Sequence, residues 1–347
     1  MQCLGRLGDK TSRQDIISFT KEHIDEIRSK LGILKNGVPS EATLCRIEKS
    51  IDPEVMAGLY AKFAARFLQP MEDGRQRMLA MDGKYTRGTT LQDGRCPDIV
   101  TIYSPEDGIA LGTEMCEEKS NEIKAGPKLL ESVDISGAVV TMDAMSCQRD
   151  IVAAVRKHGA DYLIGLKANQ KSLLWSAEDN LKDLDADDRY LPPVKLEHGR
   201  IEDRTCLVYR HLKCIEGLDK WKDLNAIVRI DVHKIEKKSG KASDETRYYI
   251  TSLAADAKTL HDYAQKHWAI ENNLHWNLDT GLHQDAIKRK YKESARNLDT
   301  IQKVVMLALN VAMRKHRPER SKDKCRLADV RRKAANNIDY AMSLLAL

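Results

Sequence analysis

The sequence lacks the features that would insert it into a membrane or export it. Its 347 residues contain no run of the roughly 18 apolar residues that a membrane-spanning helix needs, and the most apolar window, 304–313, already includes Asn310. The N-terminus has no apolar core of the kind found in secretory signals. The eight cysteines are scattered and form no C-x-x-C pair, which argues against a zinc ribbon and fits a reducing compartment. The sequence therefore predicts a cytoplasmic protein without a membrane partner.

Short motifs that bind nucleotides or activate a serine are missing as well. The sequence contains no G-x-G-x-x-G, no G-x-x-x-x-G-K-[ST] and no G-x-S-x-G. We therefore expect neither a nucleotide cofactor nor lipase-type chemistry.

Positive charge is concentrated near the C-terminus. The segment from Ala286 onward contains 16 Lys and Arg against 6 Asp and Glu, a net charge of +10, whereas the whole chain carries +5. A mildly acidic body with a basic end favours a polyanionic partner, because phosphate contacts release counterions. A solvated basic tail without a specific partner is the alternative interpretation. Within this segment Ile301, Val304, Val305, Ala308, Leu309 and Ala312 form an apolar stripe at helical spacing. We expect this stripe to dock the helix on the core and to leave its basic face and the following run 314–317 outside.

The periodicity of apolar residues predicts an α/β fold with helices at both ends. After a helical stretch over 14–68, the expected order is β-β-β-α-β-α-β-α, which is typical of a mixed sheet. The segments are strands at 78–81, 98–103, 109–115, 137–142 and 161–166, with helices at 127–133, 151–158 and 170–184. Strands return between 192 and 253, and helices resume near 256.

These segments predict five parts of the chain. They are a helical N-terminal region for DNA binding or assembly (1–75), the first part of the core (76–190), a β-strand insertion (191–253), the rest of the core with a glutamate on a helix (254–315) and a basic helical tail (316–347).

Two aspartates follow expected buried strands. Asp82 follows the apolar run 78–81, and Asp143 follows 137–142. A carboxylate at the end of a buried strand is costly unless it is paired or binds a cation. Each aspartate alone could instead form a turn, and Asp143 could cap the helix that follows it.

A glutamate is expected on the apolar face of a later helix. Glu271 falls on a stripe that runs from Leu260 to Leu278 with helical spacing, and should therefore face the core. It then needs a partner, either in an ion pair or at a metal. The spacing His267-x-x-x-Glu271-x-x-x-His275 leaves a transition-metal site as a further alternative. Three carboxylates suit Mg²⁺, which prefers oxygen ligands, and two such ions can serve phosphodiester chemistry.

Several motifs in sequence order resemble one known family. They are MDGK at 81–84 with Arg87-Gly88, EKSNE at 118–122, VTMDAMSCQRD at 140–150, DYLIGLKANQ at 161–170, HGR at 198–200 and HWAIENNLHW at 267–276. The sequence resembles the DDE transposases of bacterial insertion sequences, in the branch that includes the H-repeat-associated proteins. The resemblance covers roughly residues 10–315.

The resemblance implies a ribonuclease H-like catalytic core with the β-rich insertion between Asp143 and Glu271. It implies that Asp82, Asp143 and Glu271 are the catalytic residues and ligands of Mg²⁺ or Mn²⁺, with two ions. It also implies DNA as the partner, both element ends and target, with a homo-oligomer assembled on it in the nucleoid. The region before Gln14 is shorter than in relatives, which favours an inactive copy as one alternative.

Residues near the expected triad are candidates for DNA binding. They are Lys84, Arg87, Lys167, Asn169, Arg200, His267 and Trp268. Trp268 matches a family position that stacks on a flipped base, with core packing as the alternative. The family's Y-(2)-R-(3)-E-(6)-K signature is only partly matched, because His267 holds the arginine position and Leu278 the lysine position.

The function that follows is cutting and rejoining of DNA at insertion-sequence ends. A ribonuclease H-like nuclease without strand transfer and an inactive DNA-binding remnant are the alternatives.

Overall fold

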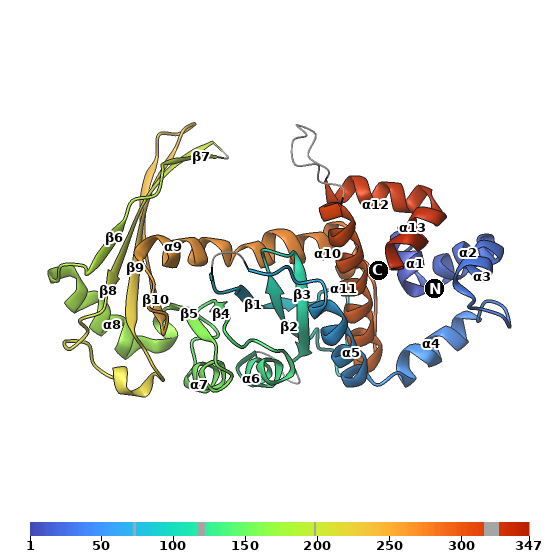
Figure 1. Ribbon diagram of the computed structural model, residues 1–347, viewed down its shortest axis with the longest axis horizontal. Coiled ribbons are helices and arrows are strands. Elements are labelled where there is room, and N and C mark those ends of the chain that lie inside the picture. The colour runs from blue at the N-terminus through green and yellow to red at the C-terminus, as the bar shows by residue number, and fades with distance from the viewer. Residues whose placement is uncertain (72–73, 117–121, 198, 316–325, 347) are drawn as a thin grey trace. The chain divides into compact units, whose positions relative to one another are not determined.

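The computed structural model describes residues 1–71, 74–116, 122–197, 199–315 and 326–346 (Figure 1). The chain divides into two compact units. The first unit comprises Met1–Pro70, Gly83–Asn121 and Glu271–Leu347, and the second comprises Met71–Asp82 and Glu122–Ile270.

Five helices begin the first unit. They are α1 (Gln2–Leu7), α2 (Arg13–Glu22), α3 (Ile24–Leu31), α4 (Glu41–Ser50) and α5 (Pro53–Ala65). Ser40 is the N-cap of α4, because its hydroxyl accepts a hydrogen bond from the Thr43 N–H at 3.2 Å. Asp52 caps α5, which begins with Pro53. Helix α1 lies before the expected helical stretch.

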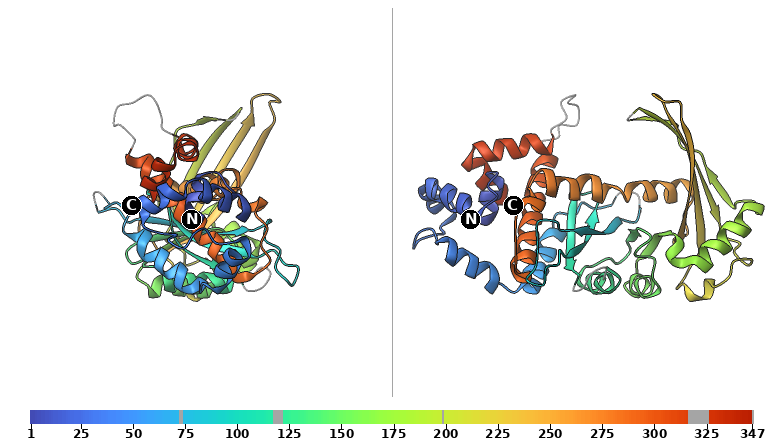
Figure 2. Two further views of the ribbon diagram at one scale, coloured as in Figure 1. Left: turned by 90° about the vertical axis from the view of Figure 1, so that its right-hand side faces the viewer. Right: turned by 180° about the vertical axis from the view of Figure 1, so that it is seen from behind.

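The rest of the first unit combines a strand pair with further helices. Strands β2 (Asp98–Ser104) and β3 (Ile109–Met115) are antiparallel, and α5 and α11 (Lys292–Lys315) contact β3. The Tyr60 hydroxyl donates to the Ala110 carbonyl at 2.7 Å and so joins α5 to β3. Helices α10 (Trp276–Thr280), α12 (Leu327–Asn336) and α13 (Ile338–Leu345) complete the unit, and α1 contacts α11, α12 and α13 (Figure 2).

Helix α11 carries the apolar stripe expected from the sequence, but its basic face is not simply exposed. Ile301, Val305 and Leu309 are buried as predicted. Lys303, however, is 1% exposed and pairs with Asp299, and Arg296 pairs with Glu54 and Glu114. The helix is buried around most of its circumference, so its cations need acidic partners. The expectation of a basic outer face on this helix was therefore wrong, and residues 316–317 of the basic run lie outside the described residues.

A long sheet forms the second unit. Strands β1 (Met78–Tyr85), β4 (Val139–Met142) and β5 (Asp161–Leu166) are parallel, and the last three residues of β1 belong to the first unit. Next to β5 come β10 (Ala242–Thr251), β9 (Ala226–Glu236), β8 (Arg200–Tyr209) and β6 (Asp188–Tyr190), all antiparallel, while β7 (Lys195–Glu197) also pairs with β8. Helices α6 (Glu122–Ser132) and α7 (Arg149–Lys157) lie side by side against the parallel strands (Figure 1), and α8 (Lys171–Asn180) and α9 (Ala257–Lys266) follow.

The order of elements along the chain confirms the expected ribonuclease H-like α/β fold. Three strands, β1 to β3, are followed by α6, β4, α7, β5 and α8. The later strands extend the sheet of the core, since Tyr248 of β10 is paired with Leu166 of β5. Helix α9 follows this extension in the sequence.

The helical stripe around Glu271 differs from the sequence-based prediction. Residues Ile270–His275 form a π-helix. Ile270 is buried between His267 and Leu274 on this stripe, and Glu271 is exposed. The expectation that Glu271 faces the core was therefore wrong, because Ile270 takes the buried position.

Candidate active site

Asp82 and Asp143 are neighbours in the second unit, since Asp82 lies within β1, which continues to Tyr85, and Asp143 directly follows the last residue of β4. The register pairs Met81 of β1 with Met142 of β4, so the next residues along both strands are the two aspartates. Parallel neighbours are about 4.8 Å apart and paired residues point to the same face of the sheet. Both aspartates are partly exposed. The structure therefore places two carboxylates next to each other where β4 ends.

The loop after Asp143 is fixed by two amide side chains. Asn169 Nδ2 donates to the Ala144 carbonyl at 2.6 Å, and Gln170 Nε2 donates to the Cys147 carbonyl at 2.8 Å. Asn169, a candidate for DNA binding, thus also positions the residue after Asp143. The sequence motif gave no sign of this contact between the two loops.

Asp143 does not cap helix α7. Its Oδ1 accepts a hydrogen bond of 3.3 Å from the Ser146 N–H, within the loop. The N-cap of α7 is Gln148, whose side chain makes no capping hydrogen bond. The alternative that Asp143 serves as a helix cap is therefore wrong.

Gly165 of β5 allows close packing behind Asp143. A Cβ at this position would lie 3.2 Å from the Ala144 backbone nitrogen. A larger residue would have to displace the loop that follows the aspartate.

A cleft of about 170 Å³ in the second unit has Asp143 in its wall. Lys167, Arg247, Tyr249, His267 and Trp268 also line it. Three of the candidates for DNA binding, Lys167, His267 and Trp268, thus share a cleft with Asp143. Trp268 is 38% exposed, so core packing does not explain it.

Arg247 is a cleft residue that the sequence did not point out. Its guanidinium carbon is 5.7 Å from the centre of the Trp268 ring. It donates to Glu245 at 2.6 Å, and Glu245 also accepts from Lys234 at 2.8 Å. Hydrogen bonds from these two cations lower the pKa of Glu245 to about 2. Arg247 is near Asp143 only because β10 pairs with β5, so no local motif could have identified it.

His267 is a buried neutral side chain. It is 8% exposed, and its Nδ1 lies 3.1 Å from the Thr141 hydroxyl of β4. Burial lowers its pKa to about 4, although the Asp143 carboxylate acts in the opposite direction. At neutral pH it therefore offers a phosphate no positive charge.

Acidification should destabilise the protein through His267. Below pH 6.5 the unfolded chain binds a proton at this residue, whereas the folded chain stays neutral until about pH 4. The unfolded state then binds more protons, so this contribution to stability falls as the pH falls through this window, by up to about 3 kcal/mol. Urea unfolding at several pH values should show a flatter pH dependence for His267→Gln than for the wild type, and the exposed His233→Gln is the control. Equal pH dependence in all three proteins would contradict the burial argument.

Glu271 lies in the first unit, where it is the first residue of the segment Glu271–Leu347. Among the residues that the structure describes, no three His, Cys, Asp or Glu side chains form a group that could hold a metal ion. The three residues of the alternative transition-metal site, His267, Glu271 and His275, do not form such a group either. The structure thus brings two members of the expected triad together, and Glu271 remains a prediction.

The remaining basic candidates have different environments. Lys84 forms ion pairs with Asp279 at 2.9 Å and Asp285 at 3.3 Å, and its side chain is 10% exposed. Arg87 and Arg200 are exposed. Within EKSNE, residues 118–121 lie outside the described part of the chain, as does His198 of the HGR motif.

Gly88 explains why the loop after β1 is held close to residues 284–285. A Cβ at Gly88 would lie 2.4 Å from the Asp285 carbonyl oxygen, and the neighbouring Arg87 N–H donates to the Asp285 carboxylate at 3.1 Å. The Arg-Gly pair thus has a packing role within the first unit.

Comparison with known proteins identifies the family. A family model described as "Transposase DDE domain" matches residues 72–310. YbfL of Escherichia coli K12 is 32% identical over 96% of this chain and 88% of its own length. The chain belongs to the DDE transposase family. The matched range contains Asp82, Asp143 and Glu271.

Other relatives confirm the branch of the DDE transposase family that the motifs predict. The H repeat-associated YhhI of Escherichia coli K12 is 31% identical over 96% of this chain and 87% of its own length. YncI of Escherichia coli O157:H7 is 30% identical over 84% of this chain and 76% of its own.

A solved structure of piggyBac transposase in a synaptic complex with hairpin DNA is similar over 99% of this chain and 70% of the piggyBac chain. The identity is 12% and the TM-score is 0.44, a likeness too weak to carry an argument. In the described part of this DDE transposase family member, no helix has the length and apolar character to cross a membrane.

Proposed function

We propose that this member of the DDE transposase family cuts DNA at the ends of an insertion sequence and joins the freed ends to target DNA. The observation that carries the proposal is that Asp82 within β1 and Asp143 directly after β4 are the next residues beyond the paired Met81 and Met142. Both lie in the range matched by the DDE domain. Family membership supports the class of reaction, and the aspartate pair supports its location.

Asp82, Asp143 and Glu271 are the proposed ligands of Mg²⁺ or Mn²⁺, with two ions bound. Carboxylate oxygens are the ligands that these cations prefer. Asp143 fits the role because it lines an open cleft and accepts one long hydrogen bond from the protein backbone. Bound ions would supply the positive charge that activates a water molecule and stabilises the leaving oxygen.

The proposed reaction has two steps. In the first, a water oxygen bonds to the phosphorus at the element end, and the 3′-oxygen leaves. In the second, that 3′-oxygen attacks a target phosphodiester and displaces the target's own 3′-oxygen. Neither step needs a covalent bond between the protein and DNA, so the protein acts by positioning and by charge.

The cleft residues have proposed roles in holding DNA. Lys167 and Arg247 would contact phosphates, and Trp268 would present its ring to a base. Asn169 would hold the Asp143 loop through the Ala144 carbonyl. His267 would hold the end of α9 against β4 as a neutral side chain. Arg87 and Arg200 remain candidates for phosphate contacts because both are exposed.

The direct test is cleavage and joining of a DNA that carries the element's own ends, with Mg²⁺ present. Joined products would support transposition, whereas cut products alone would favour a nuclease without strand transfer. DNA binding with no cleavage under any metal condition would favour an inactive DNA-binding remnant. Chemical crosslinking on the same DNA would test the proposed homo-oligomer.

DNA affinity should fall steeply with salt, and helix α12 should contribute to the slope. Arg332 and Lys333 of α12 are exposed, and each phosphate contact contributes about −0.9 to the slope of log affinity against log salt for duplex DNA. If both residues contact phosphates, Arg332→Gln with Lys333→Gln should make the slope less negative by about 1.8. Fluorescence anisotropy over a range of salt concentrations measures this.

A matched pair of surface lysines in the second unit provides the control for that experiment. Lys157 and Lys182 are 70% and 59% exposed, and Lys157→Gln with Lys182→Gln should leave the slope unchanged. A wild-type slope near zero would contradict a phosphate-binding surface altogether.

A further inference from the structure

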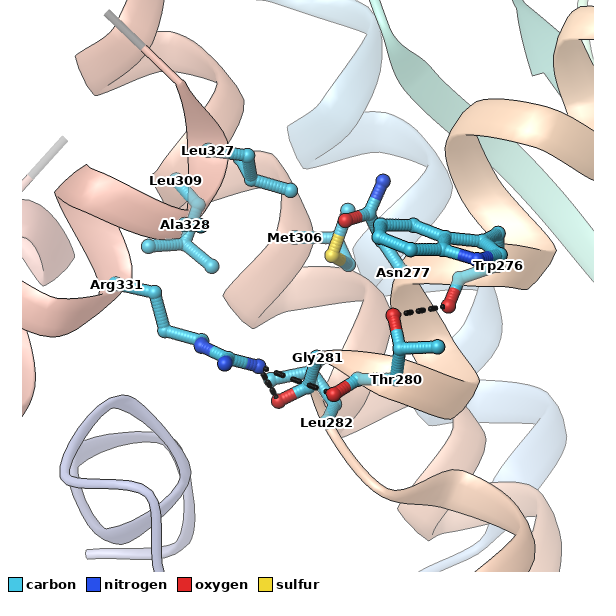
Figure 3. Close-up of a pocket in the computed structure, with 10 residues that line it drawn as sticks. All are labelled: Trp276, Asn277, Thr280, Gly281, Leu282, Met306, Leu309, Leu327, Ala328 and Arg331. Carbon is cyan, nitrogen blue, oxygen red and sulfur yellow. Dashed lines mark hydrogen bonds between the residues drawn. The ribbon is translucent and has the colours of Figure 1, made fainter. Parts of the chain in front are cut away.

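An apolar groove in the first unit lies between α10, α11 and α12 (Figure 3). Its volume is about 150 Å³. Most of its wall is apolar, and the lining includes Trp276, Leu282, Met306, Leu309, Leu327 and Ala328. Three polar side chains, Asn277, Thr280 and Arg331, also line it. Figure 3 shows Trp276 and Asn277 across the groove from Ala328 and Arg331.

Trp276 on α10 is 60% exposed and lies at the groove. A tryptophan normally buries most of its large apolar surface, so an exposed ring beside a groove indicates a binding surface. The ring is also rigid, since it has two rotatable side-chain bonds, and little freedom is lost when it is covered. The exposed indole face is therefore ready to stack on a flat partner.

The groove has a fixed shape. Arg331 of α12 donates to the carbonyl oxygens of Thr280, at 3.4 Å, and of Gly281, which lie at the end of α10. Gly281 permits this turn, because a Cβ there would be 2.5 Å from the Asn277 carbonyl oxygen. The two helices that form opposite walls are thus joined by hydrogen bonds.

The surroundings of the groove are basic. Helix α12 carries Arg331, Arg332 and Lys333 against a single acid, Asp329. Arg332 pairs with Asp329 at 3.5 Å, and the Lys333 ammonium lies 4.2 Å from the centre of the Tyr340 ring. A rigid aromatic face beside several cations is the combination that proteins use for unpaired nucleic acid, with bases on the ring and phosphates on the cations. A hydrophobic peptide would use the apolar wall but would gain nothing from these charges.

We propose that this groove binds an unpaired DNA base, stacked on the Trp276 ring, with the adjoining phosphates held by the cations of α12. The inference deepens the proposed function, because DNA cleavage and joining create strands with unpaired ends. It assigns Trp276 a binding role separate from that of Trp268, which belongs to the cleft of the second unit.

The test compares two tryptophans of equal exposure. Trp276→Ala should weaken binding of a labelled single-stranded oligothymidine of about 12 nucleotides by about fivefold to about 150-fold, the range expected for loss of one stacked base. Trp276→Phe should recover most of the affinity. The control is Trp175→Ala on α8, where the side chain is 59% exposed, and it should bind like the wild type. Because stacking releases no counterions, the salt slope should be the same in all four proteins.

Several outcomes would overturn the proposal. They are wild-type affinity in Trp276→Ala, an equal loss in Trp175→Ala, or a change in oligomeric mass without a change in DNA affinity, which would assign the groove to a second copy of the chain. Failure of this inference and failure of the proposed function would give different results. Cleavage that depends on Asp143 with no role for Trp276 removes only this inference, whereas Trp276-dependent binding without any cleavage removes the catalytic proposal and keeps the groove.

Discussion

Asp143→Asn is expected to abolish cleavage and joining of DNA that carries the element's ends, while DNA binding stays largely intact. The amide has nearly the volume of the carboxylate but lacks its negative charge, so the divalent cations lose a ligand. The loop should keep its shape, because the amide oxygen can still accept from the Ser146 N–H and the Asn169 contact is to the Ala144 backbone. Loss of an outer-shell partner alone costs 10–100-fold, so at least about a 100-fold loss is expected here.

Cleavage in Mg²⁺ and gel shift measured in parallel on the same DNA check this prediction. The matched control is Asp150→Asn, an exposed aspartate on α7 in the same unit, which should cut like the wild type. Wild-type-like cleavage by Asp143→Asn would exclude the residue as a metal ligand. A wild type that binds DNA but never cuts would favour the inactive remnant.

Residue patterns predicted most of the fold because its signals are local. Each strand of the core is a short apolar run bounded by turn residues, and its order along the chain needs no long-range information. The neighbouring positions of Asp82 and Asp143 were also predictable, since each follows an apolar run and the two strands are parallel. The end of the first strand was not, because β1 continues past Asp82 to Tyr85. The family motifs then gave these two positions a chemical meaning.

Other features depend on contacts that a sequence pattern does not contain. Arg247 reaches the cleft because β10 pairs with β5, across roughly 80 residues of chain. Glu271 was misplaced because helical spacing from His267 to Leu274 allows either Ile270 or Glu271 to face the core, and the more apolar Ile270 is the buried one. The motif placed His267 at the position of a phosphate-binding arginine, but the structure buries it against Thr141.

Net charge was the least reliable guide to the surface. The segment after Ala286 is strongly basic, but Lys303 and Arg289 are 1% and 6% exposed. Each cation that the first unit buries is unavailable to DNA and must be balanced inside the protein. The pair formed by Lys303 and Asp299 allows the contribution of this balance to the free energy of unfolding to be measured.

Asp299→Asn is expected to lower the free energy of unfolding by about 3–5 kcal/mol, the cost of leaving a buried charge without its partner. The Lys303 ammonium donates to Asp299 at 2.6 Å, and both side chains are almost fully buried. Asparagine keeps an oxygen that can accept from Thr113 or Gln284, the other donors to this carboxylate, so the loss should come mainly from the unpaired ammonium. Urea unfolding measures it.

A second substitution identifies the cause of that loss. Adding Lys303→Met to Asp299→Asn should restore at least half of the lost stability, because an apolar side chain of similar length needs no counterion. Burial already lowers the pKa of Lys303, and Asp299→Asn should lower it further. In that variant the unfolded state binds more protons than the folded state between the lowered pKa and the ordinary lysine value, so stability should rise as the pH rises through this window.

The exposed pair of Lys30 and Asp339 is the control, and Asp339→Asn should cost less than about 1 kcal/mol. If the double variant were no more stable than Asp299→Asn, the loss would come from packing around Asp299 and not from the buried charge.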